Sequence, residues 1–546
     1  MLGPSGHVDT FCRDNLPAAA NWPDLINLPT YPDHVNAGVE LSNALVAAGH
    51  GDRIALRGAE DVYTYGELAV WSDRIAQRLV DDLSLVSGNR VMVFGANTPA
   101  LVAHWLGVFK AGGVVVAAMP MLRAGELCEI ISKAAVSHVV CDARLVGEID
   151  AAVAMSGRRI SVLSFDARGR EGGTGEADRE PPRPAVAAPT GRDDVALIAF
   201  TSGSTGNPKA AMHFHRDILS MADGYARDVL AMSADDICIG TPPVAFAYGF
   251  CGLVAYPLRN AACAVLRDDL SVDALPQAIA HHRATVLFSG PTAYRKMLAT
   301  GLSGANQSSL RVAVSAGETL TAQTQDAWTD AVRVPILDAI GSTEMLSFFL
   351  TNRIGDSIAG TTGRPVEGYE VRIVDEAMRT LPRNTRGRLA VRGLTGCRYL
   401  ADGRQEETVR DGWTLTGDIF LEDDDGRFHC FGRADDIILS AGYNIAGAEV
   451  EAALASHAAV QECAVIGVPD DERGQIVEAV VVLNAGWHAD DATAESLQAH
   501  TKEEIAPYKY PRSIRFADVL PKTPSGKIQR FRLRPSEDAA SASGAA

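Results

Sequence analysis

The sequence predicts an α/β protein whose first part is built on open, largely parallel sheets. Short apolar runs alternate with helical patterns up to about residue 350. That alternation is typical of parallel strands covered by helices. The chain has 546 residues, which exceeds one ordinary domain, so we expect two or three folding units.

The first elements follow in a regular order. A helical pattern opens at Tyr63 and continues through Leu79, and Arg90–Phe94 is an apolar strand. The most apolar stretch, Leu101–Leu122, contains charged residues and a glycine pair. We therefore interpret it as a buried helix followed by a strand over Val114–Ala118, not as a membrane span.

The amino-acid composition and the pattern of predicted elements change after this region. Residues 167–192 are rich in Gly, Pro, Arg and Glu and predict a mobile connection. Alternation resumes from residue 200 to about 350, and short β-like runs dominate from about 360 to 430, which indicates a small β-rich unit. A compact α+β segment follows Asp435, and residues 536–546 form a small, polar end that we expect to fray.

Composition narrows the class of protein. A formal charge of −18 argues against a general nucleic-acid or anionic-membrane binder. The nine cysteines include no Cys-x-x-Cys pair, so neither a zinc site nor a disulfide framework is predicted. Free thiols and the lack of a signal-peptide pattern at the N-terminus favour a cytoplasmic location.

The strongest motif is Phe-Thr-Ser-Gly-Ser-Thr-Gly-Asn-Pro-Lys, residues 200–209, which follows an apolar strand over Val195–Phe200. Glycines allow close backbone approach, successive N–H groups form an anion-binding nest, and the hydroxyls and Lys209 add donors and charge. The spacing does not fit a P-loop. Taken alone, the motif leaves an ordinary surface loop and a phosphate-binding loop as equal alternatives.

Two further turns carry polar groups after strands. Ser315–Thr319 reads Ser-Ala-Gly-Glu-Thr and offers backbone against which a nucleotide base could lie. Ala339–Glu344 reads Ala-Ile-Gly-Ser-Thr-Glu and places a hydroxyl beside a carboxylate. Magnesium prefers oxygen ligands and often takes only one or two carboxylates, so Glu344 is our metal ligand and Thr343 a phosphate contact. Each turn by itself is also compatible with a plain solvated turn.

Three later motifs add charged groups. Asp418 ends Trp-Thr-Leu-Thr-Gly-Asp and can accept hydrogen bonds from both ribose hydroxyls. Arg433, in Gly-Arg-Ala-Asp-Asp, is positioned to join that network. Lys527 follows Pro-Ser-Gly in a proline-stiffened loop. A surface salt bridge and an exposed basic tail are the alternatives for the last two.

These six motifs, in this order over most of the chain, resemble those of the adenylate-forming superfamily of acyl- and aryl-CoA ligases, adenylation domains and luciferases. The resemblance implies that ATP, Mg²⁺ and coenzyme A are used. It implies catalytic roles for Lys209, Thr343, Glu344 and Lys527. It also implies an ATP site made of Thr201, Ser202, Gly203, Ser204, Thr205, Gly206, Lys209, Ser315, Ala316, Gly317, Glu318, Ala339, Ile340, Gly341, Ser342, Thr343, Asp418 and Arg433.

The resemblance also implies an architecture and a two-step reaction. A large N-terminal domain, residues 1–434, would carry ATP and acid, and a small mobile C-terminal domain, residues 435–546, would carry Lys527. A carboxylate attacks the α-phosphate of ATP, and a thiol then displaces AMP. Asp435 matches the hinge position, and the stretch Ser440, Ala441, Gly442 and Tyr443 would line a thiol tunnel after rotation.

The acid pocket is predicted from Thr241–Phe250, where aromatic side chains alternate with small ones. The stretches Phe-Ala-Tyr-Gly and Gly-Ser-Thr-Glu-Met-Leu resemble benzoate and 2-aminobenzoate CoA ligases. Benzoate ligases commonly continue Met-Leu-His-Ile, whereas this chain has Ser347 and Phe348. We hypothesise that Ser347 accommodates an ortho substituent. The predicted acid-binding set is Phe246, Ala247, Tyr248, Gly249, Gly317, Ser347 and Phe348.

The favoured function is therefore an ATP-dependent aryl acid–CoA ligase, with 2-aminobenzoate, salicylate or benzoate as substrate. An aryl-adenylating enzyme that loads a carrier protein is the alternative, although no carrier domain is evident after Lys527. A nucleotide-binding protein without catalysis is disfavoured by the intact set of charged motif residues. The expected partners are small molecules, with no nucleic acid and no membrane, and the oligomeric state is open.

Overall fold

The structure is a computed structural model that describes residues 2–166, 187–201, 208–304, 307–440, 443–470, 473–505, 507–523 and 526–534. For residues 303, 304, 435, 437, 439, 443, 444 and 474 it describes the backbone alone. Residues 167–186 of the predicted connection over 167–192 therefore lie outside the described residues. The predicted frayed end, residues 536–546, also lies outside them. The chain divides into two compact units, residues 1–371 with 390–415 and residues 372–389 with 416–546.

A six-stranded sheet in the first unit has the order β6-β5-β3-β4-β7-β8, with β8 antiparallel to the rest. Its central strands are buried on both faces, which explains their continuous apolar sequence. The predicted strands at 90–94 and 114–118 are confirmed. The strands are β3 (Arg90–Phe94), β4 (Val114–Ala118), β5 (His138–Asp142), β6 (Ser161–Phe165), β7 (Val195–Thr201) and β8 (Lys209–Phe214).

A nine-stranded sheet, also in the first unit, has the order β15-β14-β13-β12-β11-β9-β10-β1-β2. Its strands from β13 to β1 run parallel, whereas β14 is antiparallel to both of its neighbours, β13 and β15, and β2 is antiparallel to β1. The strands are β1 (Ile54–Arg57), β2 (Val62–Thr64), β9 (Ile237–Gly240), β10 (Cys263–Val265), β11 (Val286–Ser289), β12 (Val312–Ser315), β13 (Ile336–Ser342), β14 (Ser347–Thr351) and β15 (Arg364–Pro365).

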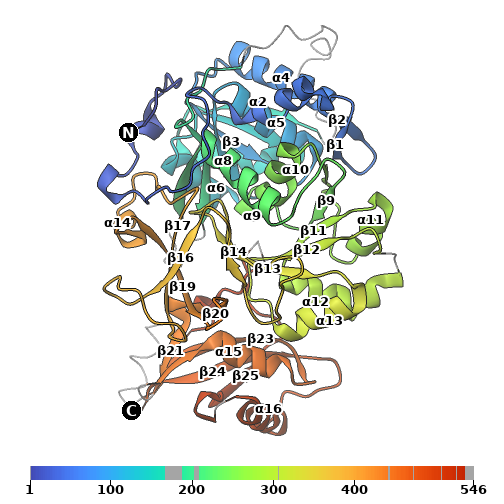
Figure 1. The fold of residues 1–546 in the computed structure, drawn as a ribbon, viewed down its shortest axis with the longest axis vertical. Coiled ribbons are helices and arrows are strands. Elements are labelled where there is room, and N and C mark those ends of the chain that lie inside the picture. Colours follow the sequence, from blue (N-terminus) through green and yellow to red (C-terminus); the bar gives the residue numbers. More distant parts are fainter. Residues whose placement is uncertain are drawn as a thin grey trace. The chain divides into compact units, whose positions relative to one another are not determined.

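Helices cover these sheets (Figure 1), as the α/β prediction requires. Tyr294 of α12 and Trp328 of α13, for example, pack edge to face in one core with Leu287 of β11 and Ala313 of β12. The helices of the first unit are α1 (Phe11–Asp14), α2 (Ala37–Glu40), α3 (Asn43–Leu45), α4 (Tyr65–Asp81), α5 (Pro99–Lys110), α6 (Ala124–Lys133), α7 (Val146–Ser156), α8 (His215–Met221), α9 (Ala247–Phe250), α10 (Tyr256–Arg259), α11 (Leu275–His282), α12 (Pro291–Ala299), α13 (Ala322–Val332) and α14 (Gln405–Thr408).

Local signals fix where the longest early helices begin. Thr64 and Glu67 form a capping box at the start of α4. Thr98 caps α5, whose first residue is Pro99. Every residue of α5 is buried, which explains why this stretch is apolar all round. None of the described helices is both long and apolar enough to cross a bilayer.

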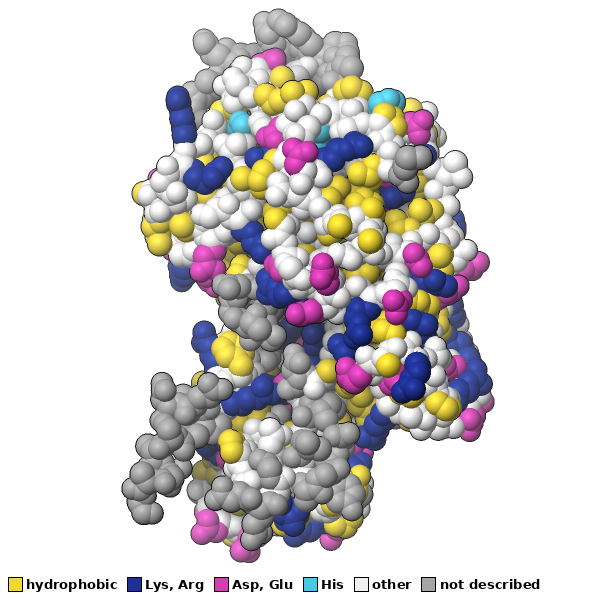
Figure 2. All heavy atoms as spheres, turned by 90° about the vertical axis from the view of Figure 1, so that its left-hand side faces the viewer, with side chains coloured by type: hydrophobic (Ala, Val, Ile, Leu, Met, Phe, Trp, Pro, Cys, Tyr) yellow, Lys and Arg dark blue, Asp and Glu magenta, His cyan; other side chains and the backbone are white. Residues whose placement is uncertain are grey.

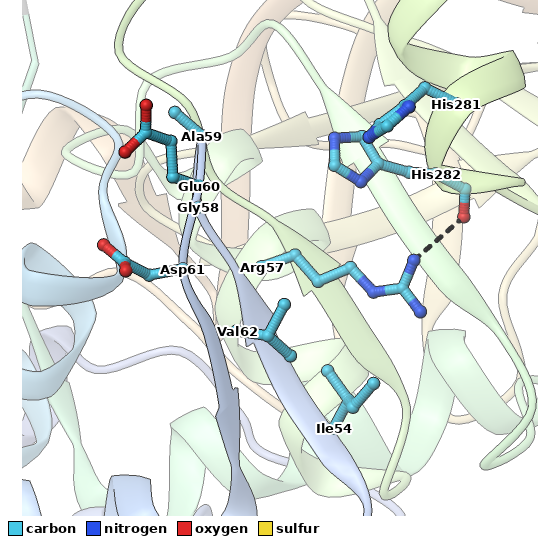
Figure 3. Close-up of a pocket in the computed structure, with 9 residues that line it drawn as sticks. All are labelled: Ile54, Arg57, Gly58, Ala59, Glu60, Asp61, Val62, His281 and His282. Atoms are coloured by element: carbon cyan, nitrogen blue, oxygen red, sulfur yellow. Dashed lines mark hydrogen bonds between the residues drawn. The ribbon is translucent and has the colours of Figure 1, made fainter.

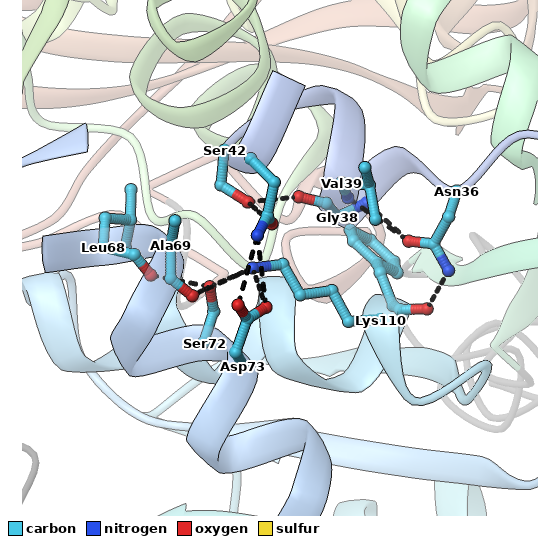
Figure 4. A network of polar contacts seen from close by, with 11 residues as sticks. Asn36, Gly38, Val39, Ser42, Leu68, Ala69, Ser72, Asp73 and Lys110 are labelled. Atoms are coloured by element: carbon cyan, nitrogen blue, oxygen red, sulfur yellow. Dashed lines mark hydrogen bonds and ion pairs between the residues drawn. The ribbon is translucent and has the colours of Figure 1, made fainter. Parts of the chain in front are cut away.

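Lys110, at the end of α5, is the centre of a buried polar network (Figure 4). Its ammonium donates to the backbone carbonyl of Ala69 at 3.2 Å, to the hydroxyl of Ser72 at 2.7 Å and to the carboxylate of Asp73 at 2.7 Å. Asn43 of α3 donates to the same carboxylate at 3.1 Å. The network therefore joins α3, α4 and α5.

A third sheet has the order β16-β17-β19-β18, with β20 paired to β19. It confirms the β-rich region predicted between residues 360 and 430. The strands of this sheet are divided between the two compact units. Residues 372–389 and those from 416 onward belong to the second unit, and residues 390–415 belong to the first. The strands are β16 (Glu370–Val374), β17 (Gly387–Arg392), β18 (Val409–Arg410), β19 (Trp413–Glu422) and β20 (Phe428–Arg433).

The fourth sheet lies in the second unit, with the order β22-β21-β24-β23 and β25 paired to β24. Alternate residues of β24 enter two cores: Val477 packs with Val450 of α15 and Leu497 of α16, while Val480 packs with Leu520 and Leu533. The elements are β21 (Ile437–Ser440), β22 (Tyr443–Ala446), α15 (Gly447–Ala455), β23 (Val460–Asp470), β24 (Gly474–Leu483), α16 (Asp491–Glu504) and β25 (Ser513–Phe516).

Charged side chains and cysteines are distributed as follows. On the face shown in Figure 2, acidic and basic side chains of the coloured residues are interspersed. All nine cysteines belong to the described part of the chain and are free thiols. Seven of them are buried, and Cys128 and Cys430 are partly exposed.

Candidate functional site

The predicted phosphate loop connects two antiparallel strands. Thr201 is the last residue of β7 and Lys209 the first of β8, and the two pair directly across the hairpin. The five residues predicted between them, Ser202, Gly203, Ser204, Thr205 and Gly206, lie outside the described residues. The structure thus shows the two ends of the loop brought opposite each other.

A second hairpin carries the predicted metal and phosphate contacts. Strand β13 includes Ala339–Ser342, the turn contains Thr343 and Glu344, and β14 begins at Ser347. Gly341 is required by the close approach of the strands, because a Cβ there would lie 2.3 Å from the carbonyl oxygen of Ser347. The hairpin therefore projects Thr343 and Glu344 together from the end of the nine-stranded sheet.

Tyr399 connects the two hairpins, and the sequence reasoning missed it. Its hydroxyl donates to Oε1 of Glu344 at 2.6 Å. The ammonium of Lys209 lies 5.1 Å from the centre of its ring. Tyr399 is 1% exposed. It belongs to no motif that we identified, and only its place in Cys-Arg-Tyr shortly after β17 marks it in the sequence.

A buried histidine contacts the backbone of the turn that contains Thr343 and Glu344. His213 is fully buried, and its Nε2 lies 2.8 Å from the carbonyl oxygen of Thr343. Burial lowers the pKa of His213 to about 4, so at neutral pH the ring is uncharged and donates this hydrogen bond through Nε2. Nearby, Arg398 and Asp217 form an ion pair at 2.9 Å, and both side chains are 0% exposed.

The predicted base-binding residues end β12 and lie next to β13. Ser315 is fully buried, and its hydroxyl has no hydrogen-bond partner among the described groups. It pairs in register with Asp338 of β13, a carboxyl that the sequence reasoning also missed. Burial raises the pKa of Asp338 to about 7, although Thr362 donates to it at 3.0 Å.

The rest of the Ser-Ala-Gly-Glu turn is shaped by its backbone and by α12. Ala316 is buried, and Gly317 has a φ of 91°, which favours glycine. The carboxylate of Glu318 accepts from the hydroxyl of Thr292 at 2.7 Å. Glu318 is thus hydrogen-bonded to the first turn of α12.

The structure brings together two of the predicted acid-pocket aromatics. The rings of Tyr248 and Phe348 meet edge to face with centres 5.3 Å apart. The Tyr248 hydroxyl lies 2.9 Å and 2.8 Å from the carbonyl oxygens of Ser289 and Val314, which fixes the ring. Phe250, expected as a further pocket wall, is buried and stacks on Trp105 at 4.9 Å, so it belongs to the core.

The neighbouring residues of the predicted pocket are arranged around α9. Phe246 precedes the helix and is half-buried, and Ala247 begins it. Gly249 has no room for a side chain, because a Cβ would lie 2.0 Å from the carbonyl oxygen of Pro243. Ser347 is buried, with its hydroxyl 3.2 Å from the carbonyl oxygen of Phe348.

In the second unit, the structure joins Asp418 to Arg433. The two residues are paired on β19 and β20, and the guanidinium donates to the carboxylate at 3.1 Å. It also donates to the carbonyl of Thr416 at 2.8 Å. Gly417 has a φ of 79°, and a Cβ there would lie 2.7 Å from the guanidinium. The structure therefore brings the two motifs into contact, and their role toward ribose stays a prediction.

The other predicted residues of the second unit are placed by their backbone. Lys527 is exposed, and its N–H donates to the hydroxyl of Thr523 at 3.0 Å. Asp435 lies in a short turn between β20 and β21, and Ser440 is buried opposite Tyr443 on β22. Ala441 and Gly442 lie outside the described residues.

The residues fit a magnesium ion that is shared with phosphates. Among the described residues, no three His, Cys, Asp or Glu side chains are grouped as a protein-only metal site. Mg²⁺ bound to nucleotide needs only one or two carboxylates. Glu344 is half-buried and uses one oxygen for Tyr399, so its other oxygen is available as a ligand.

A pocket of about 250 Å³ lies elsewhere in the first unit (Figure 3). None of the predicted site residues lines it. Arg57 donates to the carbonyl of His282 at 3.2 Å within it. The lining consists of Ile54, Arg57, Gly58, Ala59, Glu60, Asp61, Val62, His281 and His282.

Known proteins and protein-family models match most of the chain. Residues 44–398 match the family model described as AMP-binding enzyme, and residues 449–527 match that of the AMP-binding enzyme C-terminal domain. The benzoate–CoA ligase of Thauera aromatica is 34% identical to the chain over 94% of this chain and 98% of its own length.

Two solved structures are similar over nearly the whole chain. One is the anthranilate CoA ligase AuaEII in complex with anthranoyl-AMP, with a TM-score of 0.87, 29% identity and coverage of 94% of this chain and 99% of the other. The other is a benzoate CoA ligase from Burkholderia xenovorans LB400, with a TM-score of 0.83, 32% identity and coverage of 92% and 100%.

Proposed function

Because the chain belongs to the AMP-binding enzyme family, we propose that this AMP-forming acid–CoA ligase acts on aryl acids, with 2-aminobenzoate, salicylate or benzoate as its substrate. The similarity to a benzoate–CoA ligase and to an anthranilate CoA ligase supports the aryl class. The observation that carries the proposal is the pair of rings, Tyr248 and Phe348, held edge to face beside the hairpin that carries Glu344.

In the first step, a carboxylate oxygen of the acid attacks the α-phosphorus of ATP, and the bond to the bridging oxygen of the β-phosphate breaks to release pyrophosphate. Two anions must approach each other, so positive charge and N–H donors are needed. Lys209 and Lys527 supply charge, and Thr201 and Thr343 supply hydroxyls. Glu344 would hold Mg²⁺, which would neutralise phosphate charge when bound.

In the second step, the sulfur of coenzyme A attacks the acyl carbonyl, the thiol proton is lost, and AMP leaves. Asp418 and Arg433 would hold the ribose through their carboxylate and guanidinium. Residues 440–443 would line the path of the thiol after the C-terminal domain, residues 435–546, rotates about Asp435.

The ortho-substituent hypothesis concerns Ser347. The residue is 4% exposed, and its hydroxyl lies 3.2 Å from the carbonyl oxygen of Phe348. A hydroxyl in a largely apolar wall can donate or accept one hydrogen bond. Ser347→His should lower kcat/KM for 2-aminobenzoate and salicylate relative to benzoate, and an unchanged ratio would contradict the role of this serine.

The proposed function is tested with a panel of benzoate, 2-aminobenzoate, salicylate and hexanoate, each with ATP and CoA, and mass spectrometry of acyl-AMP and acyl-CoA. We expect an aryl acid to give the highest kcat/KM and both products. Preference for hexanoate would refute the aryl assignment. Acyl-AMP that transfers to an aryl carrier protein but not to CoA would favour the alternative function.

A further inference from the structure

The geometry points to Tyr399 as a positioning residue that holds Glu344 at its hydroxyl and Lys209 over its ring, so that the two charges do not neutralise each other. This inference rests on the proposed function only in that Glu344 binds Mg²⁺ and Lys209 contacts the phosphates of ATP. Neither residue's motif contains Tyr399, which enters the site from the segment after β17 (Gly387–Arg392).

The hydroxyl fixes the carboxylate. The distance of 2.6 Å between Tyr399 Oη and Glu344 Oε1 is typical of a charge-assisted hydrogen bond. The phenol is the donor in this bond, because an ionised carboxylate can only accept. One such bond stops rotation of the carboxylate and leaves the second oxygen available to a cation.

The ring fixes the lysine. A separation of 5.1 Å between the Lys209 ammonium and the ring centre lies within cation–π range. The backbone around Tyr399 is tied to β8, because Met212 donates to the carbonyl of Arg398 at 2.7 Å and Leu400 donates to that of Ala210 at 2.9 Å. The ring is thus anchored to the strand that begins with Lys209.

The arrangement keeps opposite charges apart. In the part of the chain that the structure describes, Lys209 and Glu344 form no ion pair with each other, although both contact Tyr399. A direct pair would weaken the attraction of the lysine for phosphate and of the carboxylate for a cation. Tyr399 therefore acts as a spacer between two oppositely charged groups that must both face the nucleotide.

The test compares Y399F, which keeps the ring and removes the hydroxyl, with Y399L, which removes both. Binding of a fluorescent ATP analogue is titrated with Mg²⁺ and repeated in EDTA, without acid or CoA. We expect Y399F to raise the half-saturating Mg²⁺ concentration roughly tenfold, as for loss of one hydrogen bond to a charged group, and to leave binding in EDTA unchanged. Y399L should weaken binding in EDTA as well.

Two controls separate positioning from general damage. Tyr65 is also fully buried and donates to a backbone carbonyl, that of Ala262 at 2.7 Å, so Y65F should change neither titration. In an E344Q background, Y399F should have no further effect on the Mg²⁺ dependence. An additive effect there, or a Y399F titration equal to that of the wild type, would overturn the inference.

The inference and the proposed function fail differently. If the chain binds Mg²⁺ and ATP as described but activates no aryl acid, the substrate assignment fails and the role of Tyr399 stands. If aryl-CoA is formed and Y399F leaves the Mg²⁺ dependence unchanged, the role of Tyr399 fails alone. Thermal unfolding checks each variant, and Y399F carries the test if Y399L does not fold.

Discussion

At the scale of single residues, Asp217 and Arg398 form an ion pair in which both charged side chains are fully buried. Neither side chain is exposed, and the guanidinium also lies 4.1 Å from the centre of the Phe214 ring. Burying two charges is costly, so the pair is tolerable only while both members are present. Its neighbour in sequence, Tyr399, carries the spacer role proposed above.

Removing one charge should therefore be strongly destabilising. We expect Asp217→Asn to lower the free energy of unfolding by about 3–5 kcal/mol, because it leaves the Arg398 charge buried and unpaired. Urea unfolding followed by tryptophan fluorescence measures this, since every tryptophan except Trp487 belongs to the first unit.

The matched control is Asp330→Asn. Asp330 pairs with Arg333 at 3.7 Å, and both side chains are 81% exposed. Its loss should cost less than about 1 kcal/mol. Equal effects of the two substitutions would show that burial of the Asp217 pair has no energetic consequence.

The residue scale also shows how far the sequence reasoning reached. Motif order placed Glu344, Lys209, Asp418 and Arg433 as candidates, and the structure brings the last two into contact. Their roles toward ATP stay predictions. Tyr399 was missed because its importance depends on partners that are distant in the chain, and no spacing rule connects it to them.

At the scale of elements, the network around Lys110 is a pH-sensitive connection between α3, α4 and α5. Burial lowers the pKa of Lys110 to about 8, although Asp73 opposes the shift. An unperturbed lysine titrates near 10.4. Between these values the unfolded chain binds more protons than the folded one, so this group makes stability rise with pH in that window.

Lys110→Met should remove that dependence. The difference in free energy of unfolding between wild type and K110M should change by up to about 1.4 kcal/mol per pH unit between pH 8 and 10. Below pH 8 the difference should be constant. Taking the difference cancels the contributions of tyrosines and cysteines, which titrate in the same range.

Lys296→Met is the control for this experiment. Lys296 pairs with Asp273 at 2.7 Å, but its side chain is 52% exposed. Its substitution should leave the pH profile of stability parallel to that of the wild type. A parallel profile for K110M as well would mean that Lys110 stays protonated throughout the window.

Elements were predictable where burial is uniform. Strands β3 and β4 match the predicted ranges because both of their faces are buried, which leaves a continuous apolar run between turns. The order of the nine-stranded sheet was not predictable. Neighbours such as β1 and β10 are more than 200 residues apart, and no local pattern records such pairing.

At the scale of the whole molecule, Lys527 is the residue that should distinguish the two half-reactions. We expect Lys527→Ala to abolish formation of acyl-adenylate, because the charge proposed to bridge carboxylate and phosphate is lost. CoA thioester formation from supplied acyl-adenylate should continue at a rate close to that of the wild type. Single-turnover assays of each half-reaction measure both, and equal loss of the two would contradict the domain-rotation assignment.

The domain boundary after residue 434 stays a prediction. Compactness groups residues 372–389 and 416–434 with the C-terminal region, although the motif order placed both segments in the N-terminal domain. Both boundaries at residues 389 and 415 fall inside strands of the third sheet, β17 and β19. Such grouping depends on contacts between distant segments, which the sequence reasoning did not contain.

The burial of the cysteines has a practical consequence for measuring this enzyme. Seven of the nine thiols are inaccessible, and burial raises the pKa of Cys12 and Cys141 to about 12. Thiolates, which are the reactive form, are therefore scarce on the folded protein. A chromogenic thiol reagent added to samples withdrawn from the reaction should therefore report the coenzyme A that remains against a low protein background, and a rise in that background in a control without coenzyme A would register unfolding.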